Sequence, residues 1–158
     1  MKEYEYSFKV KSIEPYINYC KDCGYEKIEV VKQNRKVYEN KNSDHIIARL
    51  TTEEKNGIKE TVFDCKNVGE KLKSLNISNE SLPMLVSDDN LEIINSILNV
   101  LEFYEAANNF RTRYVYQKGG VKFEIDDYTS PKMQVVAIEG NESEVEDVYK
   151  EIMSLETK

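Results

Sequence analysis

The strict alternation of residue types at the start of the chain is the feature that most constrains its fold. In the segment EYEYSFKVK (residues 3–11), every second residue is aromatic or aliphatic, and the residues between them are charged or small and polar. Side chains of a β-strand point to opposite faces in turn, so this segment is predicted to be a strand with one apolar and one charged face. The charged face would carry Glu3 and Glu5, followed by Lys9 and Lys11.

Similar alternation recurs along the chain and predicts a protein rich in strands. Asn56-Gly57 and Gly119-Gly120 are turn signals that join consecutive strands as hairpins. Asn34 is expected to bend the chain between two short strands. The further predicted strands are residues 27–33, 35–40, 44–52, 57–66, 109–117, 120–128 and 132–140.

Four segments have the apolar spacing of helices. Pro15 suits a first helical turn, and Gly24 suits the residue after a helix end. Asp88 or Asp89 is expected to cap one helix and Asn141 another. The predicted helices are residues 13–23, 67–76, 90–107 and 142–156, and residues 77–89 are predicted as a loop with or without a short strand.

This order of elements favours an antiparallel α+β fold in which neighbouring strands are joined by short turns. No internal repeat, low-complexity tract or linker divides the chain, so residues 1–158 are predicted to form a single domain. Two arrangements are open at this point: an open sheet with helices on one face, and a closed barrel with helices packed outside. They differ in where the charged strand faces lie, which is solvent in the first and a lumen in the second.

Strand parity places charged residues together on one face of several strands. Arg111 and Arg113 share a face, and so do Lys122, Glu124 and Asp126 in the next strand. In an open sheet this face would be an ordinary solvated surface. In a closed barrel the converging charges need a ligand, because unpaired buried charge is costly. A polyphosphate with a divalent metal would satisfy them, since carboxylates bind Mg²⁺ or Mn²⁺ while Lys and Arg bind phosphate oxygens.

Composition narrows the classes of partner. The net charge is -7, which argues against sequence-independent binding to nucleic acid. No apolar run reaches the ~20 residues of a membrane-spanning helix, and the first residues have no signal-peptide pattern, so no membrane partner and a cytoplasmic location are expected. Cys20 and Cys23 are expected to be reduced helix residues rather than a zinc site, because His45 is the only histidine.

Taken in order along the chain, these motifs resemble those of the CYTH superfamily, the triphosphate tunnel metalloenzymes. That superfamily includes class IV adenylate cyclases, thiamine triphosphatases and inorganic triphosphatases. EYEYS is similar to the opening Glu-x-Glu-x-Lys strand of the family, with Ser7 at the lysine position. The segments VKQNRKVYEN, IIAR, DCK, RTR, EID and AIE resemble later family motifs, at Gln33, Tyr38, Arg49, Lys66, Arg111, Arg113, Asp126 and Glu139.

The resemblance implies an α+β fold built on an antiparallel eight-stranded β-barrel, the triphosphate tunnel, with helices packed outside. It implies a small-molecule triphosphate or nucleotide as ligand and Mg²⁺ or Mn²⁺ as cofactor. Glu3 and Glu5 would be catalytic and would hold the metal together with Glu139. Asp126 is a further metal-side or structural candidate. The residues implied to contact phosphate are Arg49, Lys66, Arg111 and Arg113.

Three positions depart from the family pattern, because Ser7, Ile47 and Ala137 stand where the family has charged residues. Lys9 lies on the same strand face as Ser7, about 7 Å further along, and is a substitute phosphate contact.

Hydrolysis of inorganic or thiamine triphosphate is the favoured function. The alternatives are conversion of ATP to cyclic AMP, a phosphate-binding or interaction module without catalysis, and an unrelated acidic α+β domain. For the oligomeric state, a homodimer is an open alternative.

Overall fold

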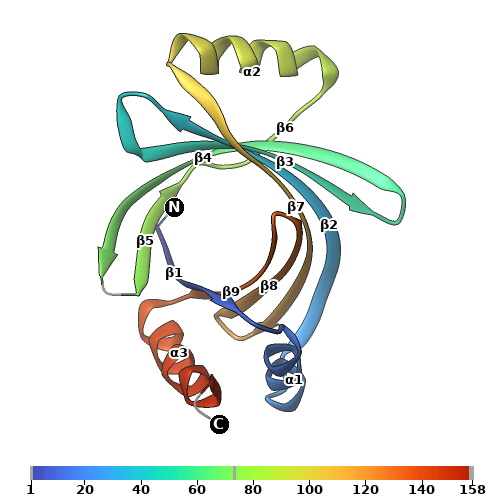
Figure 1. Ribbon diagram of the computed structural model, residues 1–158, viewed down its shortest axis with the longest axis vertical. Coiled ribbons are helices and arrows are strands. Elements are labelled where there is room, and N and C mark those ends of the chain that lie inside the picture. Colours follow the sequence, from blue (N-terminus) through green and yellow to red (C-terminus); the bar gives the residue numbers. More distant parts are fainter. Residues whose placement is uncertain (1, 73, 157–158) are drawn as a thin grey trace.

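The computed structural model describes residues 2–72 and 74–156, which form an antiparallel β-barrel with helices on its outside (Figure 1). Eight strands form the wall of the barrel, and the two-residue strand β6 (Met84–Leu85) adds to one of them. The wall strands are β1 (Lys2–Val10), β2 (Glu26–Asn40), β3 (Ser43–Lys55), β4 (Ile58–Leu72), β5 (Leu75–Glu80), β7 (Phe103–Lys118), β8 (Val121–Ser130) and β9 (Lys132–Gly140).

The hydrogen-bonding order of the strands closes the sheet. The order is β3-β2-β7-β8-β9-β1-β5-β4, and β3 also pairs with β4, so the two ends of the sheet meet. All of these pairs are antiparallel. The closed barrel is therefore confirmed, and the open sheet is excluded.

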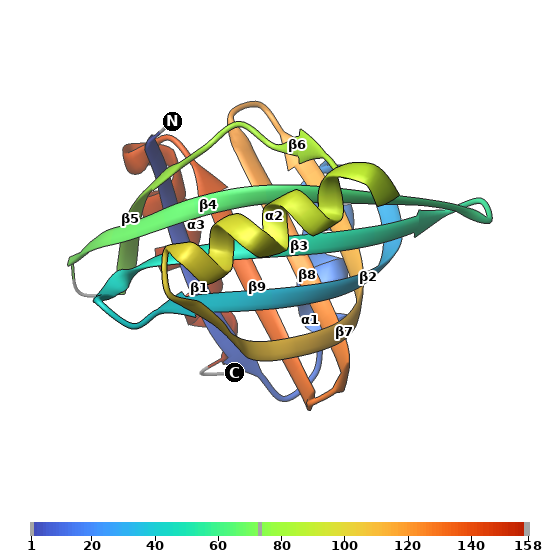
Figure 2. The same ribbon diagram turned by 90° about the horizontal axis from the view of Figure 1, so that it is seen from above.

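The helices α1 (Glu14–Asp22), α2 (Asp88–Val100) and α3 (Glu142–Glu156) pack against the outside of the wall. α1 and α3 lie on one side of the barrel and α2 lies on the opposite side (Figures 1 and 2). Tyr6 of β1 stacks on Tyr149 of α3 with ring centroids 4.0 Å apart. α2 packs Ile94 and Leu98 against Ala48. Within the described residues, none of the helices combines the length and the apolar character needed to cross a bilayer.

The two faces of the barrel wall have opposite chemistry. Phe123, Ile125 and Ile138 are fully buried in the outer core, together with Tyr6 of β1. The alternate residues of the same strands are charged and face the other way. The alternation of residues 3–11 is therefore confirmed as a strand that turns its aromatic face outward.

The predicted helix over residues 67–76 is wrong, because residues 67–72 are the end of β4 and residues 75–76 are the start of β5, while residue 73 lies outside the described residues. Backbone pairing between these two strands runs from Asn67 opposite Asn79 to Leu72 opposite Leu75, and β5 also pairs with β1. A helix this short has little stability of its own. Because β5 is the strand that joins β1 to β4, the pairing that closes the barrel outweighs the local helix pattern.

Two further predicted boundaries are wrong. The helix predicted over residues 90–107 ends at Val100, because Glu102 adopts a left-handed φ of 63° and β7 begins at Phe103. The bend predicted at Asn34 does not occur, since β2 continues through this residue and its side chain bonds to β7. Cross-strand pairing therefore overrides the turn preference of asparagine.

The cap of α2 is Ser87 rather than Asp88 or Asp89. The amide N–H of Asn90 donates to Ser87 Oγ (3.4 Å), and the amide N–H of Ser87 donates to Asn90 Oδ1 (2.7 Å). This capping box satisfies two backbone donors at the helix start. The two aspartates lie in the first turn, where the helix dipole favours negative charge.

Candidate functional site

Charged side chains face the interior of the barrel. The apolar face of the sheet lies under the helices, so the opposite face of each strand lines the tunnel. Residues opposite each other on neighbouring strands share this face, as do Glu5, Glu139 and Lys122 across β1, β9 and β8. The interior carboxylates include Glu3, Glu5, Glu53, Asp64, Glu80, Glu124, Asp126 and Glu139, and the interior cations include Arg35, Arg49, Lys66, Arg111, Arg113 and Lys122.

Glu3 and Glu5 of β1 and Glu139 of β9 form a carboxylate cluster at one end of the tunnel. One carboxylate oxygen of each residue lies within 4.8 Å of those of the other two. The cluster follows from strand geometry, since the two β1 residues share a face and Glu139 lies opposite Glu5. Lys66 Nζ donates to Glu3 at 3.1 Å, and Lys122 Nζ lies 2.7 Å from Glu139. Oxygen donors of this kind fit Mg²⁺ or Mn²⁺.

Burial and mutual repulsion raise the pKa values of the carboxylate cluster. Burial and the charge of Glu139 raise the pKa of Glu3 to about 7, against the opposing effect of Lys66. Burial and the charge of Glu124 raise the pKa of Glu139 to about 7. Burial also raises the pKa of Glu5. At neutral pH the carboxylate cluster therefore retains protons that a divalent cation would displace.

The metal-free protein is expected to lose stability as the pH rises from about 5.5 to about 7.5, because of Glu3 and Glu139. Their pKa is about 7 in the folded state against an ordinary value of 4.5, so the folded state binds more protons than the unfolded state between these values. The folded state must give up these protons as the pH rises, which lowers the free energy of unfolding. Mn²⁺ or Mg²⁺ is expected to offset the loss at the higher pH.

Thermal unfolding at both pH values, in EDTA and in Mn²⁺, measures this effect. The double variant Glu3→Gln/Glu139→Gln is the control, because it removes both titrating groups. A metal-free Tm that changes with pH equally in the wild type and the double variant would contradict the assignment of the effect to these carboxyl groups.

A first group of ion pairs extends from the carboxylate cluster along the wall formed by β3, β4 and β5. Arg49 donates from Nε and Nη2 to the two oxygens of Asp64, at 2.8 and 2.6 Å. Arg49 Nη2 also lies 3.1 Å from Glu80, which lies 3.2 Å from Lys66. Because Lys66 contacts Glu3, these residues form a continuous charged network from Arg49 to the carboxylate cluster.

A second group of ion pairs lies on β7 and β8. Arg113 donates from two nitrogens to the two oxygens of Asp126, at 2.7 and 2.8 Å, and also pairs with Glu124. Arg111 Nη1 lies 3.4 Å from Asp126. Burial disfavours the charged form of Glu124, but Arg113 and Lys122 outweigh it and hold its pKa at about 2. Asp126 thus lies between two arginines, apart from the carboxylate cluster, which favours the structural one of its two predicted roles.

The structure brings most of the predicted site residues into one tunnel but leaves Lys9 outside the charged network. Lys9 is exposed and lies opposite Val135 near the far end of β1. It lines a hollow with Lys11 and Tyr16 beside α1. A step of two residues moves a strand side chain by about 7 Å, which carries Lys9 away from the carboxylate cluster. The structure therefore gives no support to Lys9 as a substitute for a lysine at Ser7.

The structure adds residues to the tunnel lining that are not among the site residues expected from the sequence. The sequence does indicate an interior position for Lys122 and Glu124, because they alternate with apolar residues on the same strand as Asp126. For Arg35 the only indication is its alternate position along β2. The sequence offers no signal for Glu80, because its segment is predicted as a loop with or without a short strand.

The carboxylate cluster opens to solvent through a hollow of about 300 Å³ at the mouth of the tunnel. Its lining includes Glu3, Glu80 and Glu139. Gly140 has a φ of 154°, and a Cβ there would lie 2.3 Å from the carbonyl oxygen of Gly120. Only glycine therefore lets β9 end this close to the turn between β7 and β8, directly after Glu139.

Comparison with known proteins finds relatives by structure alone. No protein-family model and no curated protein sequence matches the chain. The PH1012 protein of Pyrococcus horikoshii is 20% identical, with 97% of this chain and 87% of that chain covered and a TM-score of 0.70. HpAC1 of Hippeastrum, an adenylyl cyclase candidate described as having a dominant triphosphatase activity, is 12% identical (96% and 86% covered, TM-score 0.68). A chain of the Schizosaccharomyces pombe Mediator head module is 8% identical (98% and 94% covered, TM-score 0.70).

These likenesses define the class of fold. The chain has the closed antiparallel tunnel fold with outer helices that it shares with these structures over nearly its whole length. The barrel fold that the resemblance to the CYTH superfamily implies is therefore confirmed. Because the same fold also occurs in a chain of the Mediator head module, the function must be argued from the residues of the tunnel.

Proposed function

We propose that the tunnel binds a triphosphate-containing small molecule together with Mg²⁺ or Mn²⁺ and hydrolyses its terminal phosphoanhydride bond. The observation that carries this proposal is the convergence of the carboxylate cluster with Lys66 and Arg49 inside one closed barrel. Carboxylate oxygens with raised pKa values suit a divalent cation, and the cations suit phosphate oxygens. The triphosphatase activity described for HpAC1, which shares the fold, supports the choice of hydrolysis.

In this proposal the carboxylate cluster, Lys66 and Arg113 have different roles. Glu3, Glu5 and Glu139 hold the metal, which when bound would neutralise phosphate oxygens and stabilise the charge of the transition state. Water adds to the terminal phosphorus and loses a proton, and the bridging P–O bond breaks. The products are orthophosphate and the shortened ligand, which is diphosphate when the substrate is tripolyphosphate. Lys66 is placed to contact a phosphate beside the carboxylate cluster. Arg113 is oriented by its two bonds to Asp126 before any ligand arrives, and such pre-positioned charge is the main requirement of phosphoryl transfer.

Incubation of the purified protein with tripolyphosphate tests the proposal. Orthophosphate release is expected with Mn²⁺ or Mg²⁺ and is expected to stop in EDTA. A parallel incubation with ATP distinguishes the cyclase alternative, for which the products would be cyclic AMP and diphosphate. Absence of metal-dependent product from either substrate would reject catalysis.

Binding without turnover is the second candidate function, and it is favoured by three positions of the tunnel wall that lack a charged side chain. Ser7 lies on the inner face opposite Ala137, where the family pattern has charged residues, and Ile47 lies opposite Lys66. Each missing charge weakens the stabilisation of a phosphoryl transition state. A rise in Tm caused by tripolyphosphate and metal, with no orthophosphate released, would identify this second function.

The variant Ser7→Lys is expected to lower the KM for tripolyphosphate by about tenfold or more. Ser7 is exposed although it faces the tunnel, so solvent and a longer side chain have access to this position. A charge-assisted hydrogen bond to a phosphate oxygen supplies the gain. Ser96→Lys, at an exposed position of α2, adds the same charge outside the tunnel and serves as the control. An equal effect of the two variants would show that Ser7 does not face the ligand.

A further inference from the structure

Two arginines lie on the tunnel wall opposite the carboxylate cluster. In the closed ring of strands, β2 and β7 face β1 and its neighbours from the other side of the barrel. Arg35 of β2 lies opposite Asn109, and Arg111 of β7 lies opposite Gln33. The two arginines are therefore diagonal neighbours on the inner face, which places their Cα atoms about 7–8 Å apart.

Arg35 has no carboxylate partner in the described parts of the chain. Its Nε donates to Thr51 Oγ1 at 2.9 Å. Burial, together with the positive charges of Arg111 and Arg113, lowers the pKa of Arg35 to about 9. By contrast, five other cations of the tunnel are each within ion-pair distance of at least one carboxylate: Arg49, Lys66, Arg111, Arg113 and Lys122.

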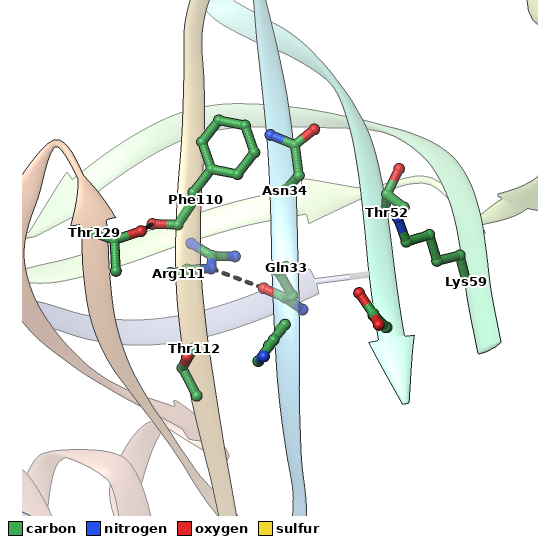
Figure 3. Close-up of a pocket in the computed structure, with 10 residues that line it drawn as sticks. Gln33, Asn34, Thr52, Lys59, Phe110, Arg111, Thr112 and Thr129 are labelled. Carbon is green, nitrogen blue, oxygen red and sulfur yellow. Dashed lines mark hydrogen bonds between the residues drawn. The ribbon is translucent and has the colours of Figure 1, made fainter. Parts of the chain in front are cut away.

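Arg111 has one nitrogen without a partner. Its Nε donates to Gln33 Oε1 at 2.7 Å (Figure 3), and its Nη1 donates to Tyr128 Oη at 2.5 Å and lies 3.4 Å from Asp126. Its Nη2 is buried and has no hydrogen-bond partner among the residues that the structure describes. The side chain is only 4% exposed, so solvent does not replace the missing acceptor. A buried donor without an acceptor is costly, which indicates that an acceptor is bound there in the functional state.

We propose that Arg35 is a further anion-binding residue of the tunnel: beside Arg111, for which the resemblance already implies a phosphate contact, it binds a tetrahedral oxyanion, which in the bound ligand is the terminal, unesterified phosphate. This proposal rests on the proposed function, because it places one end of the triphosphate on the wall opposite the carboxylate cluster. The uncommitted N–H groups of the two guanidinium groups match the oxygens of a phosphate. Thr51, which accepts from Arg35, is neutral and leaves the positive charge of Arg35 available for an anion. Arg111 shares its charge with Asp126 at 3.4 Å but keeps the unpaired Nη2 as a donor.

Arg35→Gln tests the site without metal and without turnover. Thermal unfolding in EDTA, at constant ionic strength set with chloride, is measured against increasing orthophosphate and against increasing tripolyphosphate. The wild type is expected to be stabilised saturably by these anions, and Arg35→Gln is expected to bind them about tenfold or more weakly. In the same chloride buffer without orthophosphate or tripolyphosphate, the variant is expected to have a higher Tm than the wild type, because it removes a poorly neutralised charge from among other arginines.

The two effects have opposite signs, which a merely structural arginine would not produce. Lys32→Gln is the matched control, because it removes one positive charge from an exposed position of the same strand. Arg35→Lys keeps the charge and is expected to retain part of the anion effect, which also covers the case in which Arg35→Gln folds poorly.

Each result of the two anion series decides the proposal. Weaker binding of both anions by Arg35→Gln supports a site that also takes free orthophosphate, and weaker binding of tripolyphosphate alone supports a site for the terminal phosphate of the ligand. An anion effect equal in Arg35→Gln, Lys32→Gln and the wild type overturns the proposal. A lower Tm of Arg35→Gln in the chloride buffer without orthophosphate or tripolyphosphate overturns it as well. Because no metal or turnover is involved, these results are independent of whether the protein hydrolyses tripolyphosphate.

Discussion

Replacing Glu5 with glutamine is expected to lower the rate of metal-dependent orthophosphate release from tripolyphosphate by about 10²–10³-fold. The substitution keeps the size of the side chain and removes one negative charge from the carboxylate cluster. An oxygen of Glu5 lies within 4.8 Å of oxygens of both Glu3 and Glu139, so Glu5 is a shared member of the candidate metal site. A metal held by two carboxylates would bind less tightly and would be less well placed to stabilise the transition state.

The same Glu5→Gln variant is expected to be at least as stable as the wild type in EDTA. Burial raises the pKa of Glu5, and Glu3 raises it further, so the folded state favours a neutral group at this position. Loss of activity with unchanged or higher Tm would identify Glu5 as a site residue. Glu54→Gln, at an exposed position of β3, is the matched control. Unchanged activity of Glu5→Gln, or loss of activity together with a lower metal-free Tm, would contradict the role proposed for this residue.

The carboxylate cluster could be predicted from the sequence because it depends on strand parity. Glu3 and Glu5 are separated by one residue, so any strand conformation of this segment puts them on one face. In β9 the alternate residues Val136 and Ile138 are apolar and buried under the helices, and Glu139 is the next residue after them. Its inward direction therefore also follows from the alternation. Faces are local properties of a strand, and local sequence is sufficient to specify them.

The partners of these residues could not be predicted, because they depend on which strands are adjacent and on how far each is displaced. Asp126 has the correct parity for the tunnel, but the register of β7 and β8 places it against Arg113. Glu80 reaches Lys66 only because β5 is inserted between β1 and β4, a pairing between segments whose local pattern is helical or irregular. Lys9 has the correct parity as well, but its position along β1 removes it from the charged network. Closure of the barrel, which is a property of the whole chain, fixes these relations.

Arg113→Met is expected to lower the free energy of unfolding by about 3–5 kcal/mol, because it leaves buried carboxylates without a full partner. In a chain of 158 residues this corresponds to a fall in Tm of about 10 °C. The Arg113 side chain is 12% exposed and neutralises both Asp126 and Glu124. Among the described residues, the ion pairs left after its removal are Asp126 with Arg111 at 3.4 Å and Glu124 with Lys122 at 3.0 Å.

Denaturant and thermal unfolding at neutral pH measure this loss, with Lys27→Met as the control. Lys27 is exposed on β2, so its replacement is expected to change the free energy of unfolding by less than about 0.5 kcal/mol. A similar small change for Arg113→Met would show that the buried carboxylates do not depend on this arginine.

The double variant Arg113→Met/Glu124→Gln separates the loss of the arginine from the burial of an unpaired charge. If unpaired charge is the main cause, the double variant is expected to be more stable than Arg113→Met alone.

The acid limb of the stability profile, which is the fall in the free energy of unfolding at low pH, provides an independent measure. The pKa of Glu124 is about 2 in the folded state against an ordinary 4.5, so its stabilising contribution is complete above pH 4.5 and is lost as the pH falls toward 2. Arg113→Met is expected to flatten this limb, because the arginine is the strongest of the charges that lower the pKa of Glu124. A double variant no more stable than Arg113→Met, with an unchanged acid limb, would mean that Arg113 acts in this tunnel mainly by packing rather than by charge.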